Sequence, residues 1–426
     1  INGKIDLVTN SDFNYIGENF AIVPDTSFGT YEITSEEPFQ VTYTVNEGVT
    51  WSDGEPVDAD DLLLAWAIQS GYYNDQAIDP ETGEPSGGTI YFNFAGTTWA
   101  DLDVLGGAAT LGDDGRSITV EYSKPYADWE ISFGVDKPAH VVWGQAGIES
   151  SEAFIELLTG LPQGDPSAPG EANADLMAMA SFWNTGYDTL TLPSDPSLYL
   201  SSGPYIVSDI EESASVTLVK NEAYTGDLQV PLQKIIVKMA APNATFTLYE
   251  ADQIDYMQDP APAELQIMES DPETAEQVYQ GVGDFACLYF FFDVTAEPFD
   301  KLEVRQAFSH VIDREAMQQQ IWGRQAKMAP SFLAPGFPAS NTEGLADIQR
   351  FDPELGRQLL ADAGYPDGEG FPDLILTYRG GGTPLEDATV QILAEAGYGY
   401  FPTKAEFVVG NTRIGSLDLS GPLLRI

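Results

Sequence analysis

The chain has 426 residues, with 67 acidic against 18 basic side chains and a formal net charge of −49. This charge excludes nucleic acid as a partner and disfavours an anionic membrane surface, because both attract positively charged proteins. We interpret the acidity as a device for solubility, suited to a saline or surface-exposed setting, with the steering of cationic ligands as the alternative.

Residue types that build covalent and metal sites are rare in this chain. Cys287 is the single cysteine, which excludes an intramolecular disulfide and a cysteine metal cluster. His140 and His310 are too few for a convincing metal or catalytic site. The longest apolar run, Leu62–Ile68, is far too short to span a bilayer. Because the chain opens at Ile1 rather than Met, we expect a processed or incompletely covered N-terminus.

The most informative stretch is VTYTVNEGVTWSDGEPVDADDLLLAWAIQ, residues 41–69. Its first residues alternate in polarity, which predicts a half-buried strand. Turn residues follow, among them Ser52-Asp53-Gly54. Asp58 is the predicted N-cap of a helix, and Asp61 would complete an acidic capping box. The apolar segment Leu62–Gln69 then predicts a buried helix.

The second half of the chain carries further helix patterns. Residues 302–314 place apolar side chains at helical spacing and predict an amphipathic helix. We expect Arg305 and Asp313-Arg314 to form fixed ion pairs, because polar groups near a core need partners. Asp352 is predicted to cap another helix, which ends at Gly364.

Together these patterns resemble the extracytoplasmic solute-binding proteins of ABC importers, in the peptide/nickel-type family 5. The resemblance is carried by WSDGEPVDADD (51–61), SGPYIV (202–207), PFDKLEVRQAFSHVIDR (298–314) and FDPELGRQLLADAGY (351–365). It covers residues 24–393 and fails after Glu395. We therefore expect the N- and C-terminal parts of the family pattern to be incomplete here, the C-terminal stretch being truncated, divergent or misread.

The resemblance implies an α/β, two-lobed periplasmic-binding-protein-like fold with three subdomains and a hinged cleft. We expect residues 1–20 to begin domain I, 21–185 to form domain II, 186–282 to continue domain I, and 283–426 to form domain III. Function follows from the same resemblance: capture of a small solute, which we expect to be an oligopeptide, and its delivery to ABC permease subunits.

The resemblance also implies the surroundings of the protein. We expect an extracytoplasmic monomer, either periplasmic or a cell-surface lipoprotein, that meets the membrane only through a lipid anchor or the permease. We expect no cofactor, no metal and no nucleic acid. Family members also bind nickel complexes, oligosaccharides, opines or haem, and two histidines make direct nickel ligation less attractive. A peptide sensor or surface scaffold without a transport role is the alternative from another class.

An enzyme is not predicted. The sequence lacks G-x-S-x-G, H-E-x-x-H and the phosphate-loop pattern. With 67 carboxylates, some pair will reach a glycosidase-like separation by chance, so this composition says nothing about hydrolysis.

Aromatic residues are the first candidates for ligand contact. Tyr91 and Trp99 fall where an aromatic side chain of domain II meets the ligand in related proteins. Phe285 and Tyr289 lie on a predicted strand near the cleft, and Trp183 would line the hinge region. Ordinary packing is the alternative for each of them.

A charged candidate is Arg379, which stands where some dipeptide-type members place an arginine for the ligand carboxylate. A surface or structural ion pair is the alternative. The carboxylate that holds the α-amine of a peptide in many members has no recognisable match. Cys287 is interpreted as a small buried hydrophobic residue rather than a reactive thiol.

Overall fold

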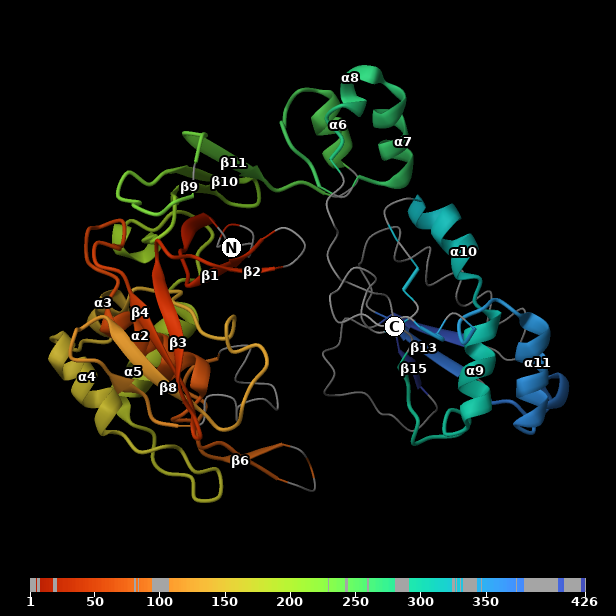
Figure 1. The fold of residues 1–426 in the computed structure, drawn as a ribbon, viewed down its shortest axis with the longest axis horizontal. Helices are drawn as coiled ribbons and strands as arrows, with labels where there is room; N and C mark the ends of the chain where they lie inside the picture. Colours follow the sequence, from red (N-terminus) through yellow and green to blue (C-terminus); the bar gives the residue numbers. More distant parts are fainter. Residues whose placement is uncertain are drawn as a thin grey trace. The chain divides into compact units, whose positions relative to one another are not determined.

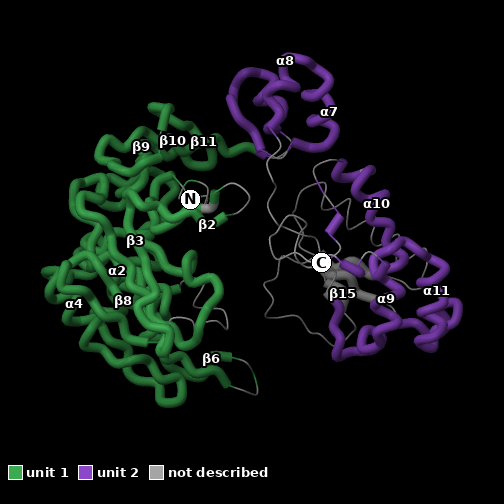
Figure 2. The backbone as a smooth tube through the Cα atoms, viewed as in Figure 1, with its two compact units in different colours: residues 1–240 green, residues 241–426 purple. Residues whose placement is uncertain are grey.

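The computed structural model folds the chain into two compact units, residues 1–240 and 241–426 (Figure 2). The structure describes residues 5, 8–17, 21–79, 82, 84–93, 107–228, 230–241, 244–258, 260–279, 291–323, 326, 328–329, 331, 343–345, 347–372, 374–378, 405–409 and 423–425. The predicted domain boundaries at residues 20, 185 and 282 divide the chain more finely than these units and stay predictions.

Antiparallel strands form the main sheet of the first unit. Its order is β3 (Gly29–Glu36), β4 (Phe39–Val45), β8 (Ser117–Tyr122) and β7 (Thr110–Leu111) (Figure 1). In β4, the buried residues Val41, Tyr43 and Val45 alternate with partly exposed ones, which confirms the predicted half-buried strand. Val41 lies opposite Val120 and Tyr43 opposite Ile118, so both strands turn apolar side chains to one core.

Helix α2 (Ala59–Ser70) follows this sheet and is buried along nearly its whole length. The capping box is confirmed: Asp58 caps the first turn, and the Asp61 carboxylate accepts a hydrogen bond from the Asp58 N–H at 3.0 Å. The helix begins three residues before the predicted Leu62, because the cap at Asp58 fixes its start. It ends at Gly71, whose φ of 59° is left-handed and suits glycine.

Further helices surround α2. Helices α3 (Ala139–Gln145) and α4 (Ser151–Gly160) contact α2, and α5 (Ala174–Thr185) packs on α3. The core that they share with the sheet contains the large buried side chains Phe13, Tyr43, Trp51, Phe92, Tyr122, Phe133 and Phe154. Aromatic burial on this scale is the main stabilising contribution to this part of the chain.

A separate core lies in the rest of the first unit. Its sheet has the order β11 (Lys234–Lys238), β10 (Ser215–Lys220) and β9 (Tyr205–Glu211), all antiparallel. The buried residues are Ile5, Tyr205, Val207, Val216 and Leu218. Short elements complete the unit: β1 (Asn14–Ile16), β2 (Ile22–Pro24), β5 (Ala77–Ile78), β6 (Pro85–Gly87) and η2 (Pro196–Tyr199).

The second unit combines helices with a mixed sheet. The sheet has the order β12 (Phe291–Phe292), β15 (Leu423–Arg425), β13 (Leu374–Tyr378) and β14 (Ala405–Val409). Strand β13 runs parallel to both β14 and β15. The helices are α6 (Thr245–Glu250), α7 (Pro262–Ser270), α8 (Pro272–Ala275), α9 (Leu302–Val311), α10 (Arg314–Met317), η4 (Gln318–Trp322), α11 (Pro353–Asp362) and η6 (Pro366–Gly368).

Helices α9 and α11 build the core of this unit. Phe299, Val304, Phe308 and Val311 pack with Leu360, which confirms the predicted amphipathic helix. The predicted cap of α11 is also confirmed, since the Asp352 side chain accepts from the backbone of the first turn.

Within the described residues, Arg305, Asp313 and Arg314 form no ion pair, so the ion pairs predicted for this region are wrong there. Arg305 donates to the carbonyl of Phe299, before α9, at 2.6 Å, and Arg314 to the carbonyl of Ser309, in the last turn of α9, at 2.9 Å. Asp313 instead caps α10. A backbone carbonyl that lacks an N–H partner can accept from a nearby guanidinium, so no carboxylate is needed.

Candidate functional site

The signature stretch around Trp51 forms a closed hydrogen-bond network at the N-terminal end of α2. The Asp61 carboxylate is 2% exposed and accepts from the Ala139 N–H at 2.7 Å, the Asp58 N–H at 3.0 Å and the Trp51 indole at 3.2 Å. Burial raises the pKa of Asp61 to about 7. These bonds tie α2 to the start of α3, and this network is therefore structural.

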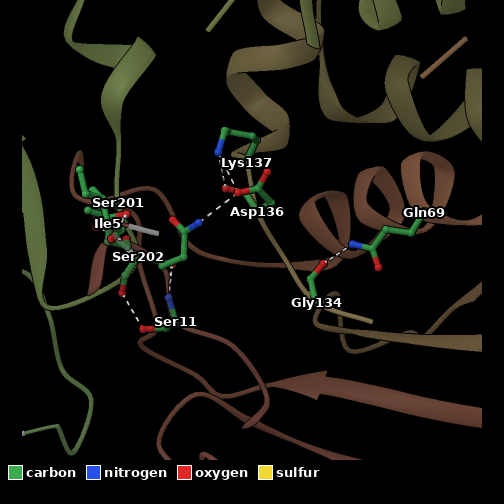
Figure 3. Close-up of polar contacts among 10 residues, drawn as sticks. Ile5, Ser11, Gln69, Gly134, Asp136, Lys137, Ser201 and Ser202 are labelled. Atoms are coloured by element: carbon green, nitrogen blue, oxygen red, sulfur yellow. Dashed lines mark hydrogen bonds and ion pairs between the residues drawn. The ribbon is translucent and has the colours of Figure 1, made fainter. Parts of the chain in front are cut away.

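Two segments that are far apart in the sequence, residues 9–11 and 201–203, cross close to the signature stretch. The Ser11 N–H donates to the Ser202 hydroxyl, and the Ser11 hydroxyl donates to the Ser202 carbonyl, both at 3.0 Å (Figure 3). The Gly203 N–H donates to the Thr9 carbonyl at 2.9 Å, and the Ser201 hydroxyl bonds the same carbonyl. The N-terminal segment is thereby fixed against the chain that enters β9.

Asp136 and Lys137 follow on the connection that leads to α3. The Lys137 ammonium lies 2.7 Å from Asp136 Oδ1, and the Asn10 amide donates to the same oxygen at 3.0 Å (Figure 3). Gln69 of α2 donates to the Gly134 carbonyl at 2.6 Å. Three segments, from the N-terminus, from α2 and from the approach to α3, thus meet at this place.

A small pocket opens beside this meeting point. It has a volume of about 20 Å³ and is lined by Leu64, Ala65, Ile68, Gln69, Asp136, Lys137 and Trp183. One wall of the pocket is therefore an apolar face of α2, another is the indole of Trp183, and the charged side chains of Asp136 and Lys137 lie at the side. The hollow has the apolar lining and few polar groups of a small-molecule site, but it is far smaller than the volume of about 300 Å³ or more that such sites span.

Tyr187 lies behind these charges. Its ring is 5.6 Å from the Lys137 ammonium and 5.2 Å from the Phe182 ring. Its hydroxyl is buried and makes no hydrogen bond within the described part of the chain. Burial raises the pKa of Tyr187, and the negative charges of Asp136 and Asp61 raise it further. The tyrosine stays neutral and supplies an aromatic face to the lysine.

Asp12 lies near the same place, and the residue is exposed to solvent. Partial desolvation of its carboxylate raises the pKa of Asp12, and the charge of Asp136 adds to the rise. The Phe13 N–H donates to Asp12 Oδ1 at 2.7 Å. A Cβ on Gly134 would lie 2.3 Å from Asp12 Oδ2, so only glycine lets the two segments approach this closely.

The structure describes Tyr91 and Trp183 among the predicted ligand residues. Tyr91 is 7% exposed, and its hydroxyl accepts from the Asn173 N–H at 2.9 Å, a contact at the start of α5. Asn184 bonds the Tyr91 carbonyl at 2.8 Å, so this tyrosine is held from both sides. Trp183 lines the pocket. Ligand contact stays a prediction for both.

Trp99, Phe285, Tyr289, Arg379 and Cys287 lie outside the described residues. Sequence reasoning did not select Asp136, Lys137 or Gln69 for the pocket. A pattern that could have drawn attention to Lys137 is its rarity, because the chain has only 18 basic residues.

A metal site is not found among the described residues, where no group of His, Cys, Asp and Glu could hold an ion. The search for membrane spans was likewise limited to these residues, and none of their helices is long and apolar enough to cross a bilayer.

The chain belongs to the bacterial extracellular solute-binding proteins, family 5, whose model matches residues 30–396. This membership confirms the predicted family and sets the protein outside the cytoplasmic membrane, as expected.

Curated relatives of the chain are binding proteins. It is 22% identical over 343 residues to the dipeptide-binding protein DppE of Bacillus subtilis, covering 79% of this chain and 53% of the relative. It is 25% identical over 322 residues to OppA, the oligopeptide-binding protein of the same organism, covering 73% and 48%. With the haem-binding protein A of Haemophilus influenzae it shares 29% identity over 180 residues, covering 42% and 31%. The chain thus spans about half the length, or less, of these relatives.

Solved structures share the fold. The periplasmic EDTA-binding protein EppA superposes with a TM-score of 0.64 at 18% identity, covering 99% of this chain and 72% of that one. The oligopeptide-binding protein AppA from Bacillus subtilis, solved with a nonapeptide, gives a TM-score of 0.59 at 16% identity, covering 96% and 70%. The fold is therefore the two-lobed α/β fold of periplasmic binding proteins, as predicted.

Proposed function

We propose that the protein is the substrate-binding component of an ABC importer, that it captures an oligopeptide outside the membrane, and that it is not an enzyme. The observation that carries this proposal is the family match over residues 30–396, together with relatives named for dipeptide and oligopeptide binding. Delivery to permease subunits, action as a monomer and the three-domain division belong to the same proposal.

The pocket beside Trp183 is the proposed contact region within the first unit. It supplies an indole, an apolar helix face and polar groups of opposite charge, and these suit the end of a peptide. Tyr91, held at both its hydroxyl and its carbonyl, does not line this pocket and belongs to the proposed set of ligand residues on the family resemblance alone. Trp99, Phe285, Tyr289 and Arg379 complete the proposed set of ligand residues.

Haem or a metal chelate is the second candidate solute, because relatives include a haem-binding protein and an EDTA-binding protein. In that case the acidic surface would oppose an anionic chelate, and the ligand would need local positive charge.

Native mass spectrometry of protein from its own source, followed by thermal shift with a mixed peptide pool, tests the proposal. A ligand at a hundredfold excess over its Kd stabilises the folded state by about 2.7 kcal/mol. A co-purified peptide, or a raised Tm with peptides, is the expected result. A shift only with haem or chelates would replace the substrate, and no shift with any solute would favour a scaffold without a transport role.

A further inference from the structure

We propose that Lys137 binds a carboxylate end group of the solute in the pocket beside Trp183, with Asp136 as its positioning residue. The proposal rests on the proposed solute-binding function and names the chemical class of ligand: a carboxylate with an apolar substituent next to it, such as the C-terminal residue of a peptide.

Because the chain has a large negative charge, a positively charged side chain in this pocket is informative about the charge of the ligand. A protein with a net charge of −49 repels anions, so a carboxylate ligand needs a local positive charge to bind. Lys137 supplies one at a pocket wall, and its side chain is 27% exposed, which leaves it open to a ligand while part of its stem is covered.

The ammonium has bonding capacity left for such a ligand. Its partners within the described residues are Asp136, through Oδ1 at 2.7 Å and the carbonyl at 3.4 Å, and the ring of Tyr187. A lysine ammonium has three donor protons, so one remains after the two contacts with Asp136. A ligand carboxylate would accept it in a charge-assisted hydrogen bond.

Asp136 holds the lysine in place. The same Oδ1 accepts from Asn10 at 3.0 Å and from Lys137, so the carboxylate is fixed by the N-terminal segment (Figure 3). A side chain that is already ordered loses less entropy when the ligand binds. Because Asn10 and Lys137 share one oxygen of Asp136, the lysine is held at the pocket while it keeps a donor proton for the ligand.

The rest of the pocket selects what adjoins the carboxylate. Leu64, Ala65 and Ile68 present an apolar face of α2, and Trp183 adds an indole. A volume of about 20 Å³ has room for roughly one water-sized group, so only the tip of a ligand enters. Leu64, Ala65 and Ile68 are themselves buried, so an alkyl or aryl group next to the carboxylate would lie mainly on the indole of Trp183.

NMR of the full chain with ¹³C-dimethylated lysines tests the proposal directly. Dimethylation keeps the positive charge, and with nine lysines in the sequence the spectrum is simple. The Lys137 signal is identified by its loss in Lys137→Met. Lys137→Arg, which keeps the positive charge, serves the same purpose if Lys137→Met folds poorly. The probes are 3-phenylpropionate and its neutral twin 3-phenylpropionamide, titrated at constant ionic strength.

The acid is expected to shift the Lys137 signal to saturation, while the exposed Lys124 serves as an internal control and stays in place. The amide should bind at least about tenfold more weakly, since it lacks the charge-assisted bond. Trp183→Leu should weaken binding of the acid several-fold. A Lys137 signal that does not move, or that moves in parallel with Lys124, overturns the proposal, as does equal binding of acid and amide.

A separate titration keeps this test distinct from that of the proposed function. A dipeptide and its C-terminal amide are compared by thermal shift on the wild type, on Lys137→Met and on Lys124→Met. Loss of the acid-over-amide preference in Lys137→Met alone supports the proposal. Peptide binding with no such preference leaves the proposed function standing and removes the role of Lys137. If no peptide binds but 3-phenylpropionate moves Lys137, the peptide assignment fails and the carboxylate site stands.

Discussion

At the N-terminal end of α2, the Asp61 carboxylate is 2% exposed and bonded to Trp51, Asp58 and Ala139, whereas near the other end of the helix Asp136 is about half exposed. There the acid shares a single oxygen between Asn10 and Lys137, and a small pocket opens beside it. A charge removed from water needs a full set of partners, while a charge at an open pocket can keep capacity for a ligand.

The comparison separates two uses of polar residues along one helix, the first on α2 itself and the second on the connection that leads to α3. The Asp61 network holds the fold, and its loss should be measured as stability. The Asp136–Lys137 pair contributes little to the fold, and its loss should be measured as binding. Variants at the two ends therefore ought to fall into different classes of effect.

The largest expected effect is that of Asp61→Ala. The substitution leaves the indole of Trp51 and the N–H groups of Asp58 and Ala139 without their acceptor in a buried place. The free energy of unfolding should fall by about 3–5 kcal/mol, measured by urea denaturation at pH 8. Asp60→Ala, which removes a carboxylate of the same turn with only partial burial, is the matched control. A loss below about 1 kcal/mol for Asp61→Ala would contradict the assigned structural role.

Asp12 is an intermediate case, exposed where Asp61 is buried, and its carboxylate accepts a hydrogen bond from the Phe13 N–H. Its pKa rises from 3.8 to about 7 on folding, so the folded state binds the proton more tightly than the unfolded state. The stability of the wild type therefore falls as the pH rises from about 4 to about 7 and levels off above that.

Asp12→Asn should remove this part of the pH dependence. Near pH 4 the variant and the wild type should be about equally stable. At pH 8 the variant should be the more stable of the two, but by less than a fully buried charge would cause, because solvent screens an exposed carboxylate. Urea denaturation at several pH values in 0.5 M NaCl, chosen to screen general repulsion, makes the comparison. Parallel stability curves for the two proteins would show that Asp12 does not titrate in this range.

Local patterns along the chain were sufficient to predict the strand at residues 41–45, the capping box at Asp58 and Asp61, and the cap at Asp352. Each depends on residues within a few positions of one another, which is why the sequence alone reveals them. The motifs around Trp51 and residues 298–314 also led to the family.

The pocket was not predictable in the same way. Asp136, Gln69 and Asn10 come from segments as much as 126 positions apart, and only the tertiary fold brings them together. The expected ion pairs of Arg305 and Arg314 failed for a related reason, since composition cannot distinguish a carboxylate partner from a backbone carbonyl. Trp183 was selected from the family pattern, and the fold adds the charged groups beside it.

Gly203→Ala tests the crossing on which the pocket depends. A Cβ at this position would lie 2.7 Å from the carbonyl carbon of Thr9 and 2.8 Å from the nitrogen of Asn10, and backbone atoms cannot swing away. We expect a loss of about 1–3 kcal/mol in the free energy of unfolding and weaker binding, because Asn10 would no longer hold Asp136. Gly144→Ala, where the added Cβ meets nothing within 4 Å, should be neutral or slightly stabilising in the same urea experiment.

The smallest effect on stability is expected for Asp136→Asn. The Asp136–Lys137 ion pair is open to solvent, with Asp136 exposed and Lys137 partly exposed, and such pairs contribute less than about 1 kcal/mol. The remaining contribution of the ion pair to stability should disappear between 0.05 and 1 M NaCl, because the Debye length falls to about 3 Å at the higher concentration. The loss of stability in Asp61→Ala should persist, because the Asp61 network is buried. Urea denaturation of both variants at the two salt concentrations checks the contrast. If Asp136→Asn cost as much as Asp61→Ala at high salt, the acid beside the pocket would hold the fold, and the distinction between the two ends of α2 would fail.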